Sequence, residues 1–341
     1  MVKVAVVGAT GAVGEVIRQV LLEHSFPFSE IRFLASEKSV GRPLTFLDKE
    51  YTILPICPAS FEGIDVVLSS TPSSVSLVSS PMAAAMGAIV IDNSSGWRMD
   101  PMVPLVVPEV NADHLDSIPK GIVANPNCST IQMVVALKPL HDAAILKRVI
   151  VSTYQASSGK GAKGLEDLNA QITAIGKGQP VPPSKAHIAQ LAGNVLANDW
   201  KLAEDGYSEE EWKMVRETRK ILSLPDLKIC PTTVRVPVQT GHSESLNVEL
   251  AHPLSPENAK KLLAKAPGIN LVDELVGGET PQPLFCVGRD EVFVGRVRRD
   301  LSVANGLALW VVADNLRKGA ATNAVQIAET LIKRGILPKK R

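Results

Sequence analysis

Residues 2–14 read Val-Lys-Val-Ala-Val-Val-Gly-Ala-Thr-Gly-Ala-Val-Gly. The first six form a nearly continuous apolar run, which is typical of a buried parallel strand. The glycines follow the spacing Gly-x-x-Gly-x-x-Gly, and the apolar residues after them recur at helical spacing (Val16, Ile17, Val20 and Leu21). A strand, a glycine turn and a helix are the context of a dinucleotide-binding fingerprint, in which a pyrophosphate lies on the helix N-terminus. A tight turn without a ligand is the alternative.

The second strand, expected at residues 31–35, bears on the choice of cofactor. An NAD enzyme usually places an acid at the end of this strand to bind the ribose hydroxyls. Here the strand is followed by Ser36, Glu37, Lys38 and Ser39. Lys38 and the serines suit a 2′-phosphate, which favours NADP, whereas Glu37 does not fit this pattern. A solvated loop lysine is the alternative for Lys38.

Two further strands are expected within residues 65–72 and 88–95, and both end in small polar residues. Strand ends of this kind line the ligand crevice of a doubly wound sheet. Arg98 lies just beyond the second one, where its guanidinium could bind a phosphate with two hydrogen bonds, although an ordinary surface arginine is the alternative. Apolar segments at residues 105–108 and 121–124 continue the sheet.

The sheet leads to Asn125-Pro126-Asn127-Cys128-Ser129-Thr130, and an apolar, helix-like segment follows. A strand, a sharp Asn-Pro turn and a helix are the expected order, so Cys128 should lie near a helix N-terminus. The amide groups there favour an anion, and hence a reactive thiolate. The alternative is a buried structural cysteine.

The second half of the chain has a different pattern. Strand-like segments dominate it, which indicates an antiparallel or mixed sheet (residues 148–155, 229–238, 245–250, 292–298 and 307–313). A charged helix is expected at residues 209–222, where Glu217 and Lys220 share a face and solvent exposure is the alternative for both. The amphipathic C-terminal helix, residues 322–333, should return to the first domain, and residues 338–341 should be a solvated end.

His242 is expected in the turn formed by residues 240–244, seven positions after Arg235 in a strand. His242 is a candidate base, and Arg235 is a candidate carboxylate-binding group beside it. The alternative is a solvated side chain, which is more common for a lone histidine in a loop. The basic glycine loop at residues 157–164 fails the P-loop pattern, because Leu165-Glu166 follows it. It can still offer backbone amides to an anion or a cofactor.

The length, net charge and composition of the whole chain limit the classes of protein to which it can belong. A chain of 341 residues allows about two domains. A net charge of +1 argues against nucleic acid or an anionic membrane as a partner. The four cysteines and six histidines are scattered, which predicts a reducing compartment, no disulfide framework and no metal site. With no signal-peptide layout and no apolar run of membrane-spanning length, we expect a cytoplasmic protein.

Taken together, these motifs suggest thiol-dependent aldehyde oxidation or acyl-phosphate reduction, and the chain closely resembles the bacterial aspartate-β-semialdehyde dehydrogenases. The resemblance covers essentially the full chain. The matching stretches are residues 8–14, 92–98 (Asp-Asn-Ser-Ser-Gly-Trp-Arg), 107–111 (Val-Pro-Glu-Val-Asn), 125–130, 154–155 (Tyr-Gln), 217–220 (Glu-Thr-Arg-Lys), 235–238 (Arg-Val-Pro-Val), 242–245 (His-Ser-Glu-Ser) and 314–321 (Asp-Asn-Leu-Arg-Lys-Gly-Ala-Ala).

The resemblance implies the reductive dephosphorylation of aspartyl phosphate to aspartate semialdehyde by NADPH, with release of inorganic phosphate. This reaction belongs to the biosynthesis of lysine, threonine, methionine and diaminopimelate. The resemblance makes Cys128 the nucleophile that forms an acyl-thioester, His242 the general acid/base, and Gln155 a residue that places the substrate and the thioester.

The resemblance also implies binding residues. Arg235 would bind the substrate α-carboxylate, Glu217 its amino group, and Arg98 and Lys220 the phosphate. The residues that would touch NADP are Gly8, Thr10, Gly11, Ala12, Val13, Lys38, Ser39, Ser158, Gly159 and Asn315.

The fold implied by the resemblance is α/β, with a Rossmann-type NADP-binding domain at residues 1–127 and a C-terminal part, about residues 314–341, returning to it. Residues 128–313 would form an α+β catalytic and dimerisation domain with a mixed, largely antiparallel sheet, in a homodimer. The sequence departs from the family pattern at residues 185–206, where residues 194–200 read Asn-Val-Leu-Ala-Asn-Asp-Trp. The family usually has an Asn-Val-Ile-Pro-like segment there.

Three other functions remain open from the residues alone. N-acetylglutamyl-phosphate reductase shares the fold and the Cys/His chemistry. A thiol hydrolase also combines Cys, His and Gln, although the glycine turn after the first strand argues against it. A non-catalytic NADP-binding protein would not need Cys128.

Overall fold

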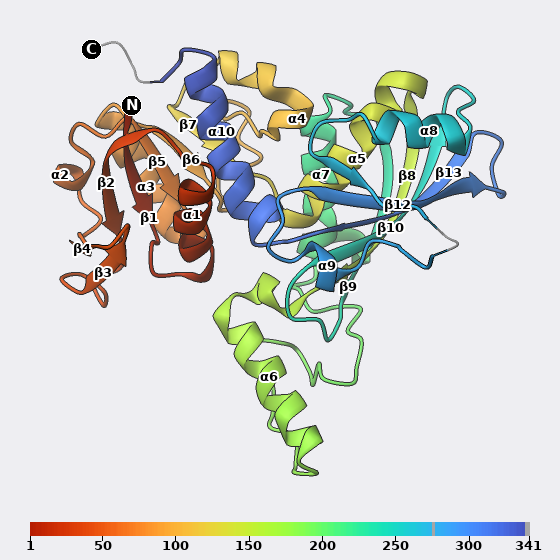
Figure 1. Ribbon diagram of the computed structural model, residues 1–341, viewed down its shortest axis with the longest axis horizontal. Coiled ribbons are helices and arrows are strands. Elements are labelled where there is room, and N and C mark those ends of the chain that lie inside the picture. Colours follow the sequence, from red (N-terminus) through yellow and green to blue (C-terminus); the bar gives the residue numbers. More distant parts are fainter. Residues whose placement is uncertain (275–276, 338–341) are drawn as a thin grey trace. The chain divides into compact units, whose positions relative to one another are not determined.

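The computed structural model describes residues 1–274 and 277–337 (Figure 1). The chain divides into two compact units, one made of Met1–Asn127 with Ala320–Arg341 and the other of Cys128–Gly319. The expected solvated end at residues 338–341 lies outside the described residues. Among the described helices, none combines the length and the apolar character needed to cross a membrane.

The first unit is a Rossmann-type fold around a parallel sheet with the strand order β2-β1-β5-β6-β7. Its strands are β1 (Val2–Val7), β2 (Phe28–Leu34), β5 (Val66–Ser69), β6 (Ile89–Asp92) and β7 (Ile122–Ala124). The longer helices are α1 (Ala12–Glu23), α3 (Ser73–Ala85) and α10 (Thr322–Lys333), and the smaller elements are the β3–β4 hairpin (Pro43–Phe46 and Lys49–Thr52), α2 (Pro58–Phe61), α4 (Pro108–Asn111) and a 3₁₀ turn (Ala112–Asp116).

The prediction of a strand at residues 105–108 is wrong. Leu105 makes a single bridge to Ala124, and Pro108 already begins α4. Proline lacks the N–H group that would continue a ladder and is favoured in the first turn of a helix, so the apolar run ends as a helix start.

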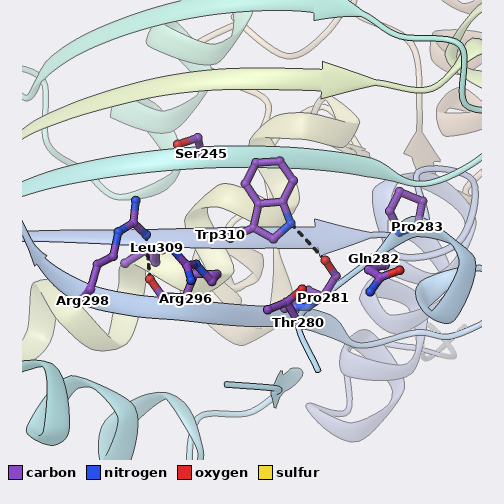
Figure 2. Close-up of a pocket in the computed structure, with 9 residues that line it drawn as sticks. All are labelled: Ser245, Thr280, Pro281, Gln282, Pro283, Arg296, Arg298, Leu309 and Trp310. Atoms are coloured by element: carbon purple, nitrogen blue, oxygen red, sulfur yellow. Dashed lines mark hydrogen bonds between the residues drawn. The ribbon is translucent and has the colours of Figure 1, made fainter. Parts of the chain in front are cut away.

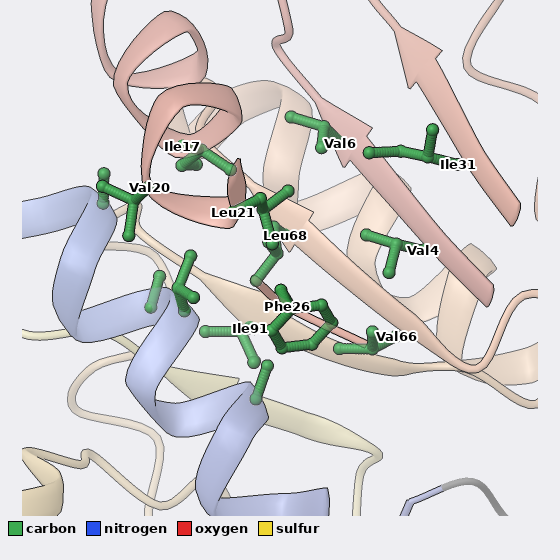
Figure 3. Close-up of a cluster of buried hydrophobic side chains, with 14 of the residues drawn as sticks. Val4, Val6, Ile17, Val20, Leu21, Phe26, Ile31, Val66, Leu68 and Ile91 are labelled. Carbon is green, nitrogen blue, oxygen red and sulfur yellow. The ribbon is translucent and has the colours of Figure 1, made fainter. Parts of the chain in front are cut away.

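The core of the first unit explains why α10 belongs to it. Figure 3 shows Ile17, Val20 and Leu21 of α1 among side chains of the central strands, including Leu68 and Ile91. Apolar residues of α10 join the same buried cluster, among them Ala324, Val325, Ala328 and Leu331. The amphipathic face of this helix, seen in the sequence as an apolar repeat, is therefore buried against a sheet built from the other end of the chain.

The second unit is built on a six-stranded mixed sheet with the order β11-β12-β13-β10-β8-β9. Neighbouring strands from β12 to β8 run antiparallel, whereas β11 and β9 run parallel to their neighbours. The strands are β8 (Leu146–Gln155), β9 (Lys228–Arg235), β10 (His242–Leu250), β11 (Ile269–Leu271), β12 (Val292–Asp300) and β13 (Gly306–Ala313). The helices are α5 (Cys128–Ala144), α6 (Ala162–Gly176), α7 (Glu209–Ile221), α8 (Pro256–Leu263) and α9 (Pro283–Cys286), with 3₁₀ turns at Ser157–Lys160 and Glu204–Gly206 and a π-turn at Arg317–Ala321.

The two faces of this sheet differ. In β10 the alternate residues Glu244, Leu246 and Val248 are buried, and α5 contacts the sheet at β8, β10, β12 and β13. Ser245 and Asn247, which point the other way, are partly exposed. At one edge, β8, β9 and β13 end where β10 begins, so residues far apart in the sequence meet there.

Candidate active site

Cys128 is the first residue of α5, a 17-residue helix, so the predicted position at a helix N-terminus is confirmed. The side chain is half-buried. The chain returns close to it at Gly319, where an added Cβ would lie 2.8 Å from the Cβ of Cys128. One turn into the helix, Gln132 Nε2 donates to the backbone oxygen of His242 at 3.4 Å. This bond ties the start of α5 to the start of β10.

His242 does not lie in a solvated turn, as the sequence suggested, but is the first residue of β10 and fully buried. Its Nδ1 accepts a hydrogen bond from the backbone N–H of Ala156 at 3.0 Å, while Nε2 has no partner among the described residues. Burial, followed by the nearby Arg235 charge, lowers the pKa of His242 to about 3, against an opposing effect of Glu210. The ring is therefore neutral, and because Nδ1 is an acceptor its proton is on Nε2.

Gln155 and Arg235 end the neighbouring strands β8 and β9 and are paired in register. Both are almost fully buried. Gln155 Nε2 lies 3.3 Å from a carboxylate oxygen of Glu210. Arg235 donates through Nη1 to the backbone oxygen of Ala156 at 2.7 Å. Since Ala156 also contacts His242, the three expected residues His242, Gln155 and Arg235 lie together.

Helix α7 supplies the next group of expected residues. Glu217 is only 1% exposed, so the alternative of a solvated side chain is wrong for it, while Lys220 is partly exposed. Glu210 is two turns earlier on the same face and contacts Gln155. The helix packs on β9 and α5, because the buried repeat that includes Met214 and Ile221 holds it there.

The glycine loop and the segment after β13 bring three expected cofactor residues to the same edge of the sheet. Ser158 and Asn315 are within hydrogen-bond distance through both Oδ1 (3.1 Å) and Nδ2 (2.9 Å) of the asparagine. Asn315 Oδ1 also accepts from the N–H of Gly241, just before His242, at 2.9 Å. Gly159 lies against Arg235 and His242, because a Cβ there would come within 2.9 Å of Arg235 Nη1.

The remaining expected cofactor residues lie in the first unit, at the carboxyl ends of β1 and β2. These strands pair up to Val7 and Leu34, and the N–H of Gly8 donates to Leu34 oxygen at 2.9 Å. Gly8 has a φ of +81°, and a Cβ there would lie 2.2 Å from Ser70 oxygen, so only glycine fits. The turn continues through Thr10 and Gly11 into α1, where Ala12 and Val13 form the first turn.

These residues fit a bound dinucleotide. The N-terminus of α1 offers backbone amides, and buried Thr71 Oγ1, beside Gly8, has no hydrogen-bond partner among the described residues. Lys38 is exposed and Ser39 partly exposed, in a turn that directly follows β2.

Arg98 lies in the first unit, beyond the end of β6. It is 7% exposed, so the alternative of an ordinary surface arginine is wrong, and its Nη2 donates to Asn93 oxygen at 2.9 Å. Cys128, His242, Gln155, Glu217, Lys220 and Arg235 lie in the second unit. That Arg98 acts together with them stays a prediction.

Several buried polar residues near the site were not predicted from sequence patterns. Glu210 stands in the run Glu209-Glu210-Glu211, which reads as an ordinary helix start, and only its spacing of seven from Glu217 could have marked it. Asp199 and Trp200 belong to the segment that departs from the family pattern. Asp199 Oδ2 accepts from Arg235 Nε at 3.0 Å, and the guanidinium of Arg235 lies 4.5 Å from the ring centre of Trp200.

The chain matches known protein families over most of its length. Residues 3–118 match the family described as "Semialdehyde dehydrogenase, NAD binding domain", and residues 137–318 match "Semialdehyde dehydrogenase, dimerisation domain". The chain is 53% identical to an aspartate-semialdehyde dehydrogenase of Aquifex aeolicus, over 98% of this chain and 99% of the relative.

Solved structures give the same result. The aspartate semialdehyde dehydrogenase II of Vibrio cholerae, complexed with ASA, has a TM-score of 0.94 and 42% identity, with 98% of each chain covered. The Candida albicans enzyme with NADP has a TM-score of 0.77 and 26% identity, with 99% of this chain and 100% of that chain covered. The chain therefore belongs to the aspartate-semialdehyde dehydrogenases, oxidoreductases of amino-acid biosynthesis.

Proposed function

We propose that this protein catalyses the NADPH-dependent reductive dephosphorylation of L-aspartyl-4-phosphate to L-aspartate 4-semialdehyde through an acyl-thioester on Cys128. The observation that carries the proposal is the meeting of His242, Gln155 and Arg235 at the sheet edge beside the start of α5. The reaction would serve the biosynthesis of lysine, threonine, methionine and diaminopimelate. We place the reaction in a reducing compartment such as the cytoplasm, as the scattered cysteines of the sequence suggest.

Cys128 is proposed as the nucleophile. The amides at the N-terminus of α5 favour its thiolate. The sulfur attacks the acyl carbon of aspartyl phosphate, so an S–C bond forms while the C–O bond to phosphate breaks and inorganic phosphate leaves. Phosphate binding is assigned to Arg98 and Lys220, since a guanidinium and an ammonium suit this anion.

His242 is proposed as a hydrogen-bond donor and proton carrier. Because its Nδ1 is occupied by the Ala156 N–H, its Nε2–H would donate a hydrogen bond to the substrate oxygen that becomes negative. Once the thioester carbon has gained the hydride that a bound cofactor would supply, this oxygen re-forms the C=O bond while the C–S bond breaks, and the aldehyde and the Cys128 thiolate separate. Gln155 would orient the acyl group. Donors at the N-terminus of α5 would stabilise the oxyanion, and each is typically worth about 3 kcal/mol of transition-state stabilisation. Arg235 would bind the α-carboxylate and Glu217 the amino group.

The cofactor is proposed to be NADP(H), which supplies the hydride when it is bound. The glycine turn at residues 8–14 would hold the pyrophosphate, and Lys38 with Ser39 would hold the 2′-phosphate. Ser158, Gly159 and Asn315 would contact the nicotinamide side. The match to an NAD-binding domain and the Candida albicans neighbour that contains NADP support a nicotinamide cofactor.

We also propose a homodimer formed through the face of the second sheet that α5 does not cover. Figure 2 shows this face, with Trp310 lying over the sheet near Ser245 and its Nε1 donating to Pro281 oxygen at 3.0 Å. The Trp310 ring lies 5.3 Å from that of Tyr154, which is 38% exposed. A half-exposed aromatic pair on a sheet face is typical of an interface, and the matched dimerisation domain supports it.

The test is phosphate-dependent formation of NADPH from L-aspartate 4-semialdehyde by the purified protein. We expect turnover with phosphate, none without it, and little with the N-acetylglutamate semialdehyde. Cys128→Ala should abolish turnover and keep NADPH binding, while Cys230→Ala, which changes an exposed thiol, should remain active. An acyl adduct should appear on Cys128 by mass spectrometry. Turnover that survives in Cys128→Ala, or an adduct on another cysteine, would refute the proposal.

A further inference from the structure

Asp199 is a buried carboxylate at the centre of a hydrogen-bond cluster in the second unit. Its side chain is 0% exposed. Oδ2 accepts from Arg235 Nε at 3.0 Å and from His187 Nδ1 at 2.9 Å. Oδ1 accepts from the N–H of Ile188 at 3.0 Å, and Lys160 Nζ is 3.4 Å from Oδ2. Burial raises the pKa of Asp199, but the hydrogen bonds from His187, the Ile188 N–H and Arg235 outweigh it and hold the pKa below its usual value.

The cluster continues from His187 to Ser157. His187 Nε2 lies 2.8 Å from Ser157 Oγ, so Ser157, His187 and Asp199 have the distances of a serine-histidine-aspartate triad. The arrangement is not a hydrolase site, because Ser157 is fully buried and its hydroxyl donates to Gly164 oxygen at 2.6 Å. The chain of contacts instead holds the position of Asp199.

Asp199 acts on Arg235, whose guanidinium is held on two edges and one face. Nε donates to Asp199, and Nη1 donates to Ala156 oxygen at 2.7 Å. The Trp200 ring lies 4.5 Å from the guanidinium carbon, which is cation–π distance. The hydrogen bonds of this guanidinium to described residues run through Nε and Nη1, which leaves Nη2 as the group that would meet the substrate carboxylate.

The physical effect of this clamp is preorganisation. A guanidinium is planar and recognises a carboxylate with a fork of donors, so its orientation matters as well as its charge. A buried arginine without a counter-ion would carry a large desolvation cost. Asp199 removes that cost in the free protein and fixes the plane before substrate arrives, which reduces the entropy lost on binding.

We propose that Asp199, held by His187, is a positioning residue that orients Arg235 and thereby makes the enzyme select substrates with an α-carboxylate. The inference rests on the proposed role of Arg235. It predicts that loss of Asp199 harms carboxylate-bearing substrates specifically. A purely structural role of Asp199 would harm all substrates equally.

The chain offers a matched control in Asp167. Its carboxylate caps the same segment as His187, accepting from Ser184 Oγ (2.8 Å) and from the N–H groups of Lys185 and Ala186 (2.6 Å each). No described contact joins Asp167 to Arg235. Asp167→Asn therefore loosens the segment that carries His187 and leaves the direct contacts of Arg235 with Asp199 and Ala156 in place.

The experiment compares kcat/KM for L-aspartate 4-semialdehyde and for 3-aminopropanal, the same aldehyde without the carboxylate. Asp199→Asn should lower the value for the semialdehyde roughly tenfold to hundredfold, the range for one charge-assisted hydrogen bond. The value for 3-aminopropanal and the KM for phosphate should stay within about twofold of wild type, on the same basis. Asp167→Asn should lower Tm and leave the ratio of the two substrates unchanged. Equal losses for both aldehydes in Asp199→Asn, or no loss, would overturn the proposal.

Arg235→Lys separates this proposal from the proposed function. If Arg235→Lys lowers the preference for the carboxylate and Asp199→Asn does not, only the role of Asp199 fails. If neither variant changes the preference, the assignment of Arg235 itself fails. If Asp199→Asn does not fold, His187→Gln gives a second test. It removes the imidazole donor to Asp199 and keeps the Asp199 carboxylate. An unchanged preference in folded His187→Gln would then count against the clamp.

Discussion

Gly159→Ala is a small change that should act directly on the candidate site. The backbone of Gly159 is outside the left-handed region, so alanine is tolerated there without strain. The added Cβ, however, would lie 2.9 Å from Arg235 Nη1, 3.4 Å from His242 Cε1 and 3.5 Å from His242 Nε2. The methyl group therefore enters the space between the proposed carboxylate-binding group and the proposed proton donor.

The size of the effect follows from these distances. Ordinary contact begins at 3.4 Å, so Arg235 Nη1 must retreat by 0.5 Å. A retreat directed away from Ala156 oxygen would lengthen the bond to that oxygen from 2.7 Å to about 3.2 Å, the limit of a good hydrogen bond. A misplacement of about 1 Å can cost about a hundredfold in rate, so half of that should cost roughly tenfold. We expect a tenfold or larger loss of kcat/KM and less than about 1 kcal/mol of lost stability.

The assay is phosphate-dependent NADPH formation with each substrate varied in turn, together with Tm. Gly176→Ala is the matched control, because this glycine ends α6 with nothing within 4 Å. It should keep full activity and gain about 0.5–1 kcal/mol of stability. Gly161→Ala tests strain alone, since it has open space but a φ of +70°; it should lose about 1–2 kcal/mol of stability and keep its activity. Wild-type kcat/KM in Gly159→Ala would refute the reasoning.

Four further outcomes are expected. Burial raises the pKa of Glu244 well above 4.5, so the contribution of Glu244 to folding stability is fully present below pH 4.5 and is lost as pH rises through the raised pKa. Glu244→Gln should reduce the fall of Tm with rising pH. An unchanged slope of Tm against pH in this variant would contradict the prediction. His242, with its pKa lowered to about 3, should remain neutral with the proton on Nε2 in nitrogen NMR at pH 5–8, and a protonated ring at pH 6 would exclude this tautomer. Arg98→Lys should raise KM for phosphate roughly tenfold to hundredfold while Arg235→Lys affects the semialdehyde; the reverse pattern would exchange the two roles. Lys38→Ala should lower the preference for NADP over NAD, and equal use of both cofactors by the wild type would remove the argument.

Local patterns carried the prediction of the individual elements. The start of α5 at Cys128, the glycine turn before α1 and helix α10 at residues 322–333 were all readable, because each depends on short-range backbone chemistry or on helical periodicity. The prediction of a strand at residues 105–108 was wrong, although its error also had a local cause. Two flanking prolines outweighed an apolar pattern that suggested strand pairing.

The motif resemblance supplied roles for single residues, but not their surroundings. His242 was expected in a loop and is instead buried at the start of β10. Its depressed pKa depends on burial and then on the Arg235 charge, and its tautomer depends on the N–H of Ala156, which lies 86 positions earlier in the sequence. No local pattern reports desolvation, because burial is decided only when the strands pair.

Short-range sequence patterns were enough to predict the class of fold, the place of Cys128 at a helix start, and the residue types that the proposed chemistry needs. How those residues are held can be seen only in the folded chain. Asp199 reaches Arg235 across 36 positions, and Ala156 reaches His242 across 86. Such contacts arise from strand register and loop packing, which are non-local, and so a sequence read through short-range patterns leaves them unspecified.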